Sequence, residues 1–155
     1  ALDPDFLSNG YVYLLYTVDY HHLTKYGTPE YDPQVTAEGV DTIGRVTRYT
    51  AQISTGFRTV DPASRLILLG ESMTTGIPIA SDSHGVGTLL FGEDGTLLVS
   101  TGESAAGPGS GTALADGIFR PKEDVGSFRA QLVDSLCGKI LRVDPLTGDG
   151  VSSNP

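Results

Sequence analysis

Short apolar or alternating runs recur along the chain, separated by turn residues. The six runs are residues 11–17, 44–50, 65–69, 88–91, 97–100 and 138–144. Runs of this length, with β-branched side chains or a period of two, are typical of β-strands. Asp-Gly or Asp-Pro turns stand at most junctions, and strands do not alternate with helices. The sequence therefore predicts an antiparallel all-β fold.

The same patterns predict how individual strands are covered. Residues 11–17 are apolar without interruption, so we expect both faces of that strand to be buried. Residues 44–50 alternate long polar and apolar side chains, which predicts one face open to water. Residues 60–63 contain Asp61-Pro62 and are expected to form a turn before the strand at 65–69.

Three segments lie outside these strands. Residues 18–42 are mostly polar and long for a connection, which indicates a functional or family-specific loop. Residues 104–111 hold four glycines and prolines without a hydrophobic anchor and are expected to be flexible. Residues 124–136 carry apolar side chains at three- and four-residue intervals, so they predict one short amphipathic helix.

The runs at 88–91 and 97–100 predict a β-hairpin with a histidine before it and a carboxylate after it. Asp94-Gly95 between the runs supplies the positive φ that a tight turn needs. The two ends of a hairpin meet opposite its turn, so His84 and Glu103 should lie close together, although nineteen positions separate them. This is the arrangement of a general base with its orienting carboxylate, and also that of an ordinary surface pair.

Composition narrows the classes of partner. The 155 residues carry a net charge of −9, which disfavours nucleic acid and anionic lipid. No apolar run approaches the roughly 20 residues that cross a bilayer. The single Cys137 excludes an internal disulfide, and its apolar neighbours predict a buried, inert thiol.

Other polar residues predict little chemistry. His21 and His22 are adjacent, and on an extended chain they would point to opposite sides without a third ligand, so no metal site is predicted. The remaining candidates are expected to be solvated or paired surface charges; they are Asp116, Arg120, Lys122 and Arg129.

A turn followed by an apolar strand occurs twice, at residues 3–14 and 93–100, which favours a β-propeller. Three phrases in this order resemble the glucose/sorbosone dehydrogenase family. They are Ala1-Leu2-Asp3-Pro4-Asp5-Phe6 with Asn9-Gly10-Tyr11-Val12-Tyr13, then Ser83-His84-Gly85-Val86-Gly87 with Phe91-Gly92-Glu93-Asp94-Gly95-Thr96-Leu97-Leu98-Val99-Ser100, and Gly138-Lys139-Ile140-Leu141-Arg142-Val143-Asp144-Pro145. The resemblance implies a six-bladed β-propeller with four-stranded antiparallel blades. A family domain is more than twice as long as this chain. Residues 1–155 are therefore expected to be an N-terminal-half fragment of two to three blades that continues beyond both ends.

The resemblance also implies a reaction and its residues. The family oxidises aldose sugars at C1 with pyrroloquinoline quinone and calcium, and His84 stands at the place of the catalytic base. Glu103 stands where the family has the aspartate that orients this base, and Val86 replaces a family glycine. Most groups that hold the quinone and the calcium are expected outside this chain, so the fragment alone should be inactive.

Two functions remain open at this point. The first is a quinone-dependent sugar dehydrogenase that is extracellular or periplasmic, as the resemblance implies. The alternative is a non-catalytic propeller that serves as an extracellular binding or adhesion module. In both cases we expect the remaining blades, on the same or a separate chain, to be the partner that keeps these residues folded.

Overall fold

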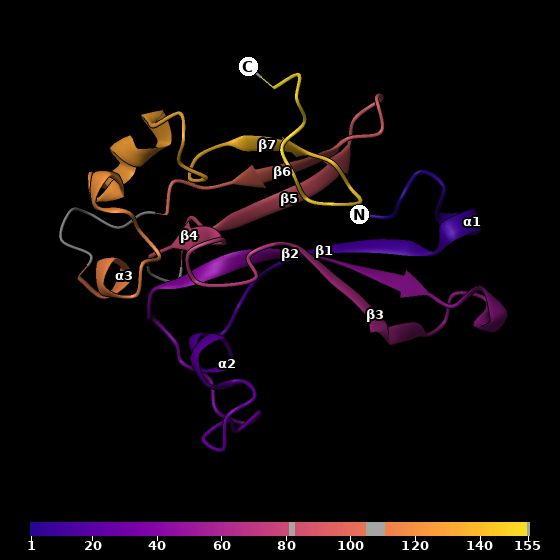
Figure 1. Cartoon of the computed structure of the whole chain (residues 1–155), viewed down its shortest axis with the longest axis horizontal. Helices are drawn as coiled ribbons and strands as arrows, with labels where there is room; N and C mark the ends of the chain where they lie inside the picture. Colours follow the sequence, from indigo (N-terminus) through magenta and orange to yellow (C-terminus); the bar gives the residue numbers. More distant parts are fainter. Residues whose placement is uncertain (81–82, 105–110, 155) are drawn as a thin grey trace.

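A computed structural model describes residues 1–80, 83–104 and 111–154 as two antiparallel sheets that lie against each other (Figure 1). The first sheet has the order β1-β2-β3, and β4 also pairs with β2; the second has the order β5-β6-β7. The strands are β1 (Tyr11–Thr17), β2 (Thr42–Ala51), β3 (Val60–Leu69), β4 (Ile77–Ile79), β5 (Val86–Phe91), β6 (Leu97–Thr101) and β7 (Ile140–Val143).

Short helices occupy the connections. They are α1 (Phe6–Asn9), α2 (Tyr20–Lys25), α3 (Gly111–Ala115) and the 3₁₀ segments η1 (Ile53–Thr55), η2 (Pro121–Glu123) and η3 (Gly126–Gln131). The described residues contain no helix that is long and apolar enough to cross a membrane.

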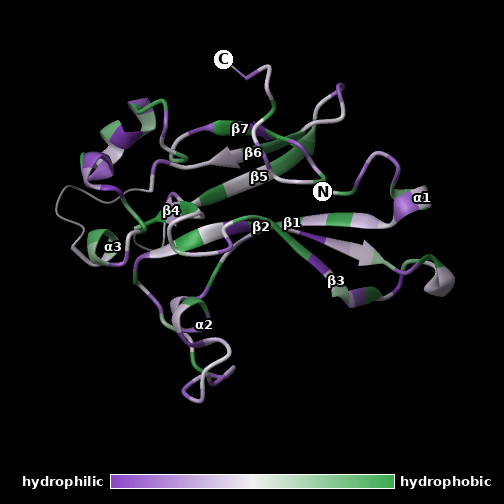
Figure 2. Ribbon diagram, viewed as in Figure 1, coloured by the Kyte–Doolittle hydropathy of each residue, from purple (hydrophilic) through white to green (hydrophobic). Residues whose placement is uncertain are grey.

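The main core forms where the two sheets meet, and hydrophobic residues recur along the strands of both (Figure 2). The ring of Tyr13 in β1 meets the ring of Phe91 in β5 edge to face, with 5.2 Å between centroids. Both sheets contribute buried side chains to this core: Tyr13, Val46, Leu68, Ile77, Leu97, Val99 and Val143. The period-two pattern of the strands thus directs one face of each sheet into a shared core.

A second cluster joins the end of the first sheet to the loops around η2 and η3. Its buried members are Val18, Ile43, Ala80, Ala113, Ile118, Phe119 and Cys137. This cluster anchors the segments that flank the start of β5, where the candidate site lies.

All six predicted strands are present, but the structure corrects their number and one boundary. β4 was not predicted, because three residues are too few to show a period. The turn expected at residues 60–63 is wrong: Val60 pairs with Ala51 and Asp61 with Thr50, so these residues begin β3. A bulge between Arg48 and Thr50 accommodates this extension.

Two expectations about strand coverage are also wrong. β2 was expected to have one wet face, yet Arg45 and Thr47 are buried at 4% and 0% exposure. Their polar atoms find partners there: Arg45 Nε donates to the Gly70 carbonyl at 2.6 Å, and Thr47 Oγ1 lies 3.0 Å from the Tyr16 hydroxyl. In β1, expected to be covered on both faces, Leu14 is 45% exposed.

The amphipathic helix predicted at 124–136 does not form. Only the six residues of η3 are helical, Gly126 has a φ of +62°, and Leu132 is already extended. Two apolar residues of the supposed buried face, Phe128 and Val133, are 76% and 92% exposed. The backbone at both ends therefore stops the helix before its apolar stripe can pack.

The two predicted loops differ from expectation where they are described. The loop at 18–42 contains α2, whose first turn is capped by Asp19 Oδ1, which accepts from the His22 amide at 3.0 Å. Ser104 is buried, and its Oγ accepts from the Ala80 amide at 2.6 Å, so it is held in place. The rest of the predicted flexible loop, residues 105–110, lies outside the described residues.

Candidate functional site

The hairpin of β5 and β6 brings His84 and Glu103 together, as its geometry predicts. Val86 pairs with Thr101 at the open end of the hairpin. Beyond this pair, His84 Nδ1 lies 2.5 Å from Glu103 Oε1. The imidazole is 57% exposed and the Glu103 side chain 29%. The predicted proximity is thus confirmed, and the extra methylene of a glutamate still allows contact.

The backbone of His84 is in an unusual conformation that its neighbours hold. Its φ is +52°, in the left-handed region that costs a non-glycine residue about 1–3 kcal/mol. The His84 carbonyl accepts from the Ser104 amide at 2.8 Å, and the Gly85 carbonyl accepts from the Gly102 amide at 2.6 Å. These bonds clamp the segment before β5 onto the segment after β6.

Glycine at position 102 allows this close approach. A Cβ added there would lie 2.2 Å from the His84 carbonyl oxygen, closer than any side chain tolerates. The position of the His84 imidazole therefore depends on the absence of a side chain at Gly102.

Glu103 is held from the other side by η3 and by the segment between η3 and β7. Its carbonyl accepts from Arg129 Nη1 at 3.2 Å, and the neighbouring Gly102 carbonyl accepts from the Gly138 amide at 2.8 Å. The hydrogen bond from His84 lowers the pKa of Glu103 most, and the charge of Arg129 lowers it further. Glu103 is accordingly a carboxylate at neutral pH.

The charge on Glu103 fixes the tautomer of His84. A carboxylate can only accept hydrogen bonds, so Nδ1 carries the proton and donates it. In the neutral ring Nε2 is then left with a free lone pair. An exposed imidazole in this state is able to take a proton from a bound hydroxyl group.

A cavity of about 610 Å³ adjoins the imidazole. It lies between the end of β1, the 37–42 segment and the start of β5, and its lining residues are Thr17, Val18, Asp19, Ala37, Glu38, Gly39, Val40, Thr42, Ile79, Ser83, His84, Gly85 and Val86. Among these described residues there are two carboxylates and neither lysine nor arginine. The lining suits a neutral polar ligand with hydroxyl groups.

Pyrroloquinoline quinone, the cofactor that the family resemblance implies, does not fit this lining. It is a tricarboxylate, and anionic groups are normally held by cationic side chains or clustered backbone amides. The carboxylates of Asp19 and Glu38 would repel it. Nor do the described residues bring together three side chains of the types that bind metals.

His21 and His22 lie on α2, not on an extended chain as the sequence argument assumed. His21 Nε2 accepts from the Asp32 amide at 3.1 Å, and His22 Nδ1 lies 3.1 Å from the Tyr31 hydroxyl. The two rings pack with Tyr26 and Tyr31 as part of an aromatic cluster. These contacts hold α2 against the segment around Tyr31, so the two histidines have a structural role.

Cys137 is buried as predicted. Its thiol lies 3.8 Å from the Pro78 carbonyl, and burial raises its pKa. A thiol with a raised pKa and no exposure is a poor nucleophile.

One residue beside the site, Arg129, does not lie where its sequence predicts. Arg129 was expected on the surface but is completely buried. No periodicity marks it, because its burial depends on loops that come together only in the fold. Arg120 matches the expected paired charge, with Nη2 at 2.9 Å from Glu123 Oε1 and Nη1 at 3.1 Å from Asp134 Oδ2.

Comparison with known proteins shows a likeness of fold. No family model matches the chain, and no curated protein does. A solved structure described as a glucose dehydrogenase matches with a TM-score of 0.57 and 18% sequence identity. The match covers 100% of this chain and 32% of that one, so the chain spans about a third of its length. The match therefore shows a fold shared with part of that solved structure.

Proposed function

We propose that this chain provides the catalytic base of a dehydrogenase that oxidises an aldose sugar at C1. The observation that carries the proposal is the pair of His84 and Glu103, in which Glu103 holds the proton on Nδ1 and leaves Nε2 free. The likeness of fold to a glucose dehydrogenase supports the choice of substrate class.

The chemistry of the pair follows from its geometry. A sugar in the adjoining cavity would place its C1 hydroxyl at His84 Nε2, which takes the proton as general base. The imidazolium that forms is stabilised by the Glu103 carboxylate at 2.5 Å. The electron pair left on oxygen forms the C1 carbonyl as the C1 hydrogen departs with its bonding pair.

A two-electron acceptor must take that hydride. On the family resemblance, pyrroloquinoline quinone with calcium would supply this acceptor if the rest of the protein holds it, because the described residues of the cavity do not fit it. The cavity lining supports a sugar site in this chain and a quinone site elsewhere in the protein, because its carboxylates suit a neutral sugar better than an anionic quinone. An extracellular or periplasmic location belongs to the same proposal.

The two departures from the family phrases are compatible with it. Glu103 reaches Nδ1 despite its extra methylene. Val86 packs toward Gly44, since its Cγ1 lies 2.2 Å from the place where a Cβ on that glycine would stand. Gly44 thus makes room for the valine.

A non-catalytic binding module is the second candidate. The observation that favours it is the lack of cationic side chains among the described residues of this cavity, so that these residues offer no cation to hold an anionic quinone. The dehydrogenase should oxidise the sugar, whereas the binding module should not.

The test is dye reduction by the intact protein with pyrroloquinoline quinone, calcium and a panel of aldoses. His84→Gln should lower kcat by about 10²–10⁴-fold, the usual contribution of a general base. His21→Gln, on α2 and not among the residues that line the cavity, is the matched control and should retain activity. Turnover that survives His84→Gln would refute the catalytic role, and cofactor binding without turnover would establish the binding module.

A further inference from the structure

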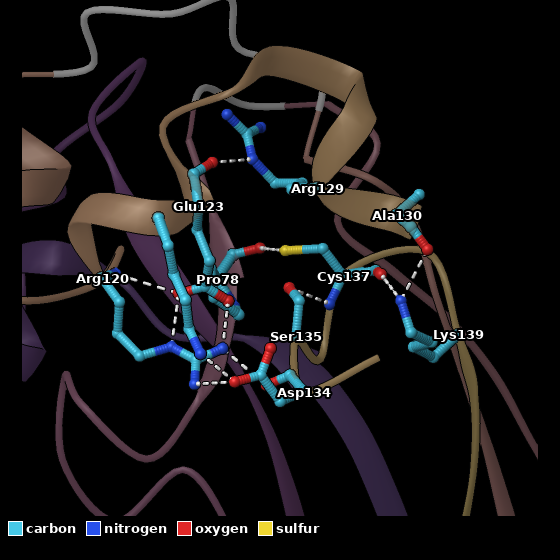
Figure 3. A network of polar contacts seen from close by, with 10 residues as sticks. Pro78, Arg120, Glu123, Arg129, Ala130, Asp134, Ser135, Cys137 and Lys139 are labelled. Carbon is cyan, nitrogen blue, oxygen red and sulfur yellow. Dashed lines mark hydrogen bonds and ion pairs between the residues drawn. The ribbon is translucent and has the colours of Figure 1, made fainter. Parts of the chain in front are cut away.

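Arg129 connects the η2–η3 region to the candidate site. Its Nε donates to the Glu123 carbonyl at 2.9 Å, as Figure 3 shows, and its Nη1 donates to the Glu103 carbonyl at 3.2 Å. The guanidinium also lies over the Phe119 ring, with 4.1 Å from Cζ to the centroid. One buried side chain thus ties together three segments.

The anchor on the η2 side is itself fixed. Glu123 is 3% exposed, and its Oε2 accepts from the Arg120 amide at 2.9 Å and from Arg120 Nε at 3.0 Å. Arg120 reaches on to Asp134, and this network is drawn in Figure 3. The bonds to Arg120 restrain Glu123, and Arg129 is bonded to the Glu123 carbonyl. Arg129 therefore restrains the Glu103 carbonyl as well.

The position of the Glu103 carbonyl matters to the carboxylate on the same residue. Gly102 and Ser104, on either side of Glu103, carry the backbone bonds to Gly85 and His84. A rotation of the peptide after Glu103 would turn the Ser104 amide away from the His84 carbonyl and so shift His84 relative to the Glu103 carboxylate. The bond from Arg129 opposes that rotation.

We propose that Arg129 is a positioning residue that holds Glu103 in hydrogen-bond contact with His84 Nδ1. Burial of an arginine is costly unless its donors are used, so a purely hydrophobic residue would serve better if packing alone were needed here. The inference rests on the proposed function of the pair, but the contact itself is measured without turnover.

The test follows the His84 ring in intact protein labelled with ¹⁵N-histidine, with the signals assigned through His84→Gln. Ring nitrogen shifts report which nitrogen carries the proton. The wild type should show a protonated Nδ1, and Glu103→Gln, which removes the charge of the acceptor, should weaken this preference. Arg129→Met, which keeps the volume and removes the donors, should shift the tautomer ratio toward that of Glu103→Gln.

Arg45→Met is the matched control. Arg45 is also buried, at 4% exposure, and its Nε also donates to a backbone carbonyl, that of Gly70, but it does not line the cavity beside His84. It should lose stability comparably while the His84 signals keep the wild-type pattern. A wild-type tautomer in folded Arg129→Met overturns the proposal.

A second variant covers the case in which Arg129→Met does not fold. Arg129→Lys keeps the charge and loses the planar fork that serves two carbonyls at once. It should show a partial tautomer shift, and kcat should fall about tenfold with KM unchanged if a base is misplaced. Wild-type ring nitrogen shifts of His84 in Arg129→Lys would contradict a positioning role. The same change of the His84 ring shifts in Arg45→Met as in the Arg129 variants would also contradict it. If the wild-type protein has no turnover, the ring shifts still decide this proposal while the proposed function fails.

Discussion

At the scale of single residues, the site combines backbone strain at His84 with a charged partner. The φ of +52° at His84 persists because its carbonyl and the Gly85 carbonyl accept from Ser104 and Gly102. Strain of this kind gathers at functional sites, where surrounding contacts overdetermine it. The pair with Glu103 gains from that fixed geometry.

The pKa of Glu103 leads to a prediction about acid stability. It lies below the ordinary 4.5, chiefly because of the hydrogen bond from His84. A carboxyl whose pKa is lowered in the folded state stabilises the fold above its unfolded pKa, and this contribution is lost as the pH falls through the folded value. We therefore expect the stability difference between wild type and Glu103→Gln to shrink as the pH falls below 4.5.

Urea unfolding of both proteins between pH 7 and pH 3 measures this difference. Glu93→Gln, which removes a carboxylate from the turn at the far end of the same hairpin, is the control. A difference that does not shrink between pH 4.5 and pH 3 would show that the carboxylate of Glu103 does not stabilise the folded state.

At the scale of elements, the two ends of the β5–β6 hairpin have different requirements. Gly95 in the turn has a φ of +77° with open space around it, whereas Gly102 lies against the His84 carbonyl. Gly95 is needed for the left-handed backbone of the turn. Gly102 is needed for the close approach of the His84 carbonyl at the site.

Alanine at each position should separate these roles. Gly95→Ala should cost about 1 kcal/mol through its left-handed backbone and leave activity intact. Gly102→Ala should cost about 1–3 kcal/mol by overpacking against backbone and also lower kcat, because it displaces His84. Thermal unfolding and kinetics of the two variants provide the measurement. Equal activity in both would contradict the structural account of Gly102.

At the scale of the whole molecule, the two sheets share one core but leave apolar side chains open to water. The exposed fractions are 45% for Leu14, 62% for Leu90, 92% for Val133 and 74% for Ile140. Open sheet edges and apolar patches favour association with other chains. The chain spans about a third of the glucose dehydrogenase structure it matches, and the blades of the proposed propeller are our proposed partner for these surfaces.

The 155 residues produced alone should accordingly self-associate and unfold without a sharp transition. Light scattering after gel filtration gives the oligomeric state, and calorimetry gives the cooperativity. The matched control is the same segment within the intact protein, which should unfold cooperatively. A monomeric, cooperative transition of the isolated chain would refute the dependence on other blades.

The sequence by itself determined the strands that have a clear period of two and the meeting of His84 with Glu103. Both depend on local geometry, because alternation selects a face and a tight turn brings the ends of a hairpin together. The family phrases also led to the propeller architecture, which the likeness of fold supports in part.

The tertiary structure alone decided which polar groups are buried. Arg129 and Arg45 look like surface charges in the sequence, and each is buried against backbone carbonyls from distant segments. β4 and the failed helix after Asp124 have the same origin, because pairing and packing across the chain outweigh a local pattern. Burial depends on contacts between residues far apart in sequence, and a local pattern of side chains does not predict such contacts.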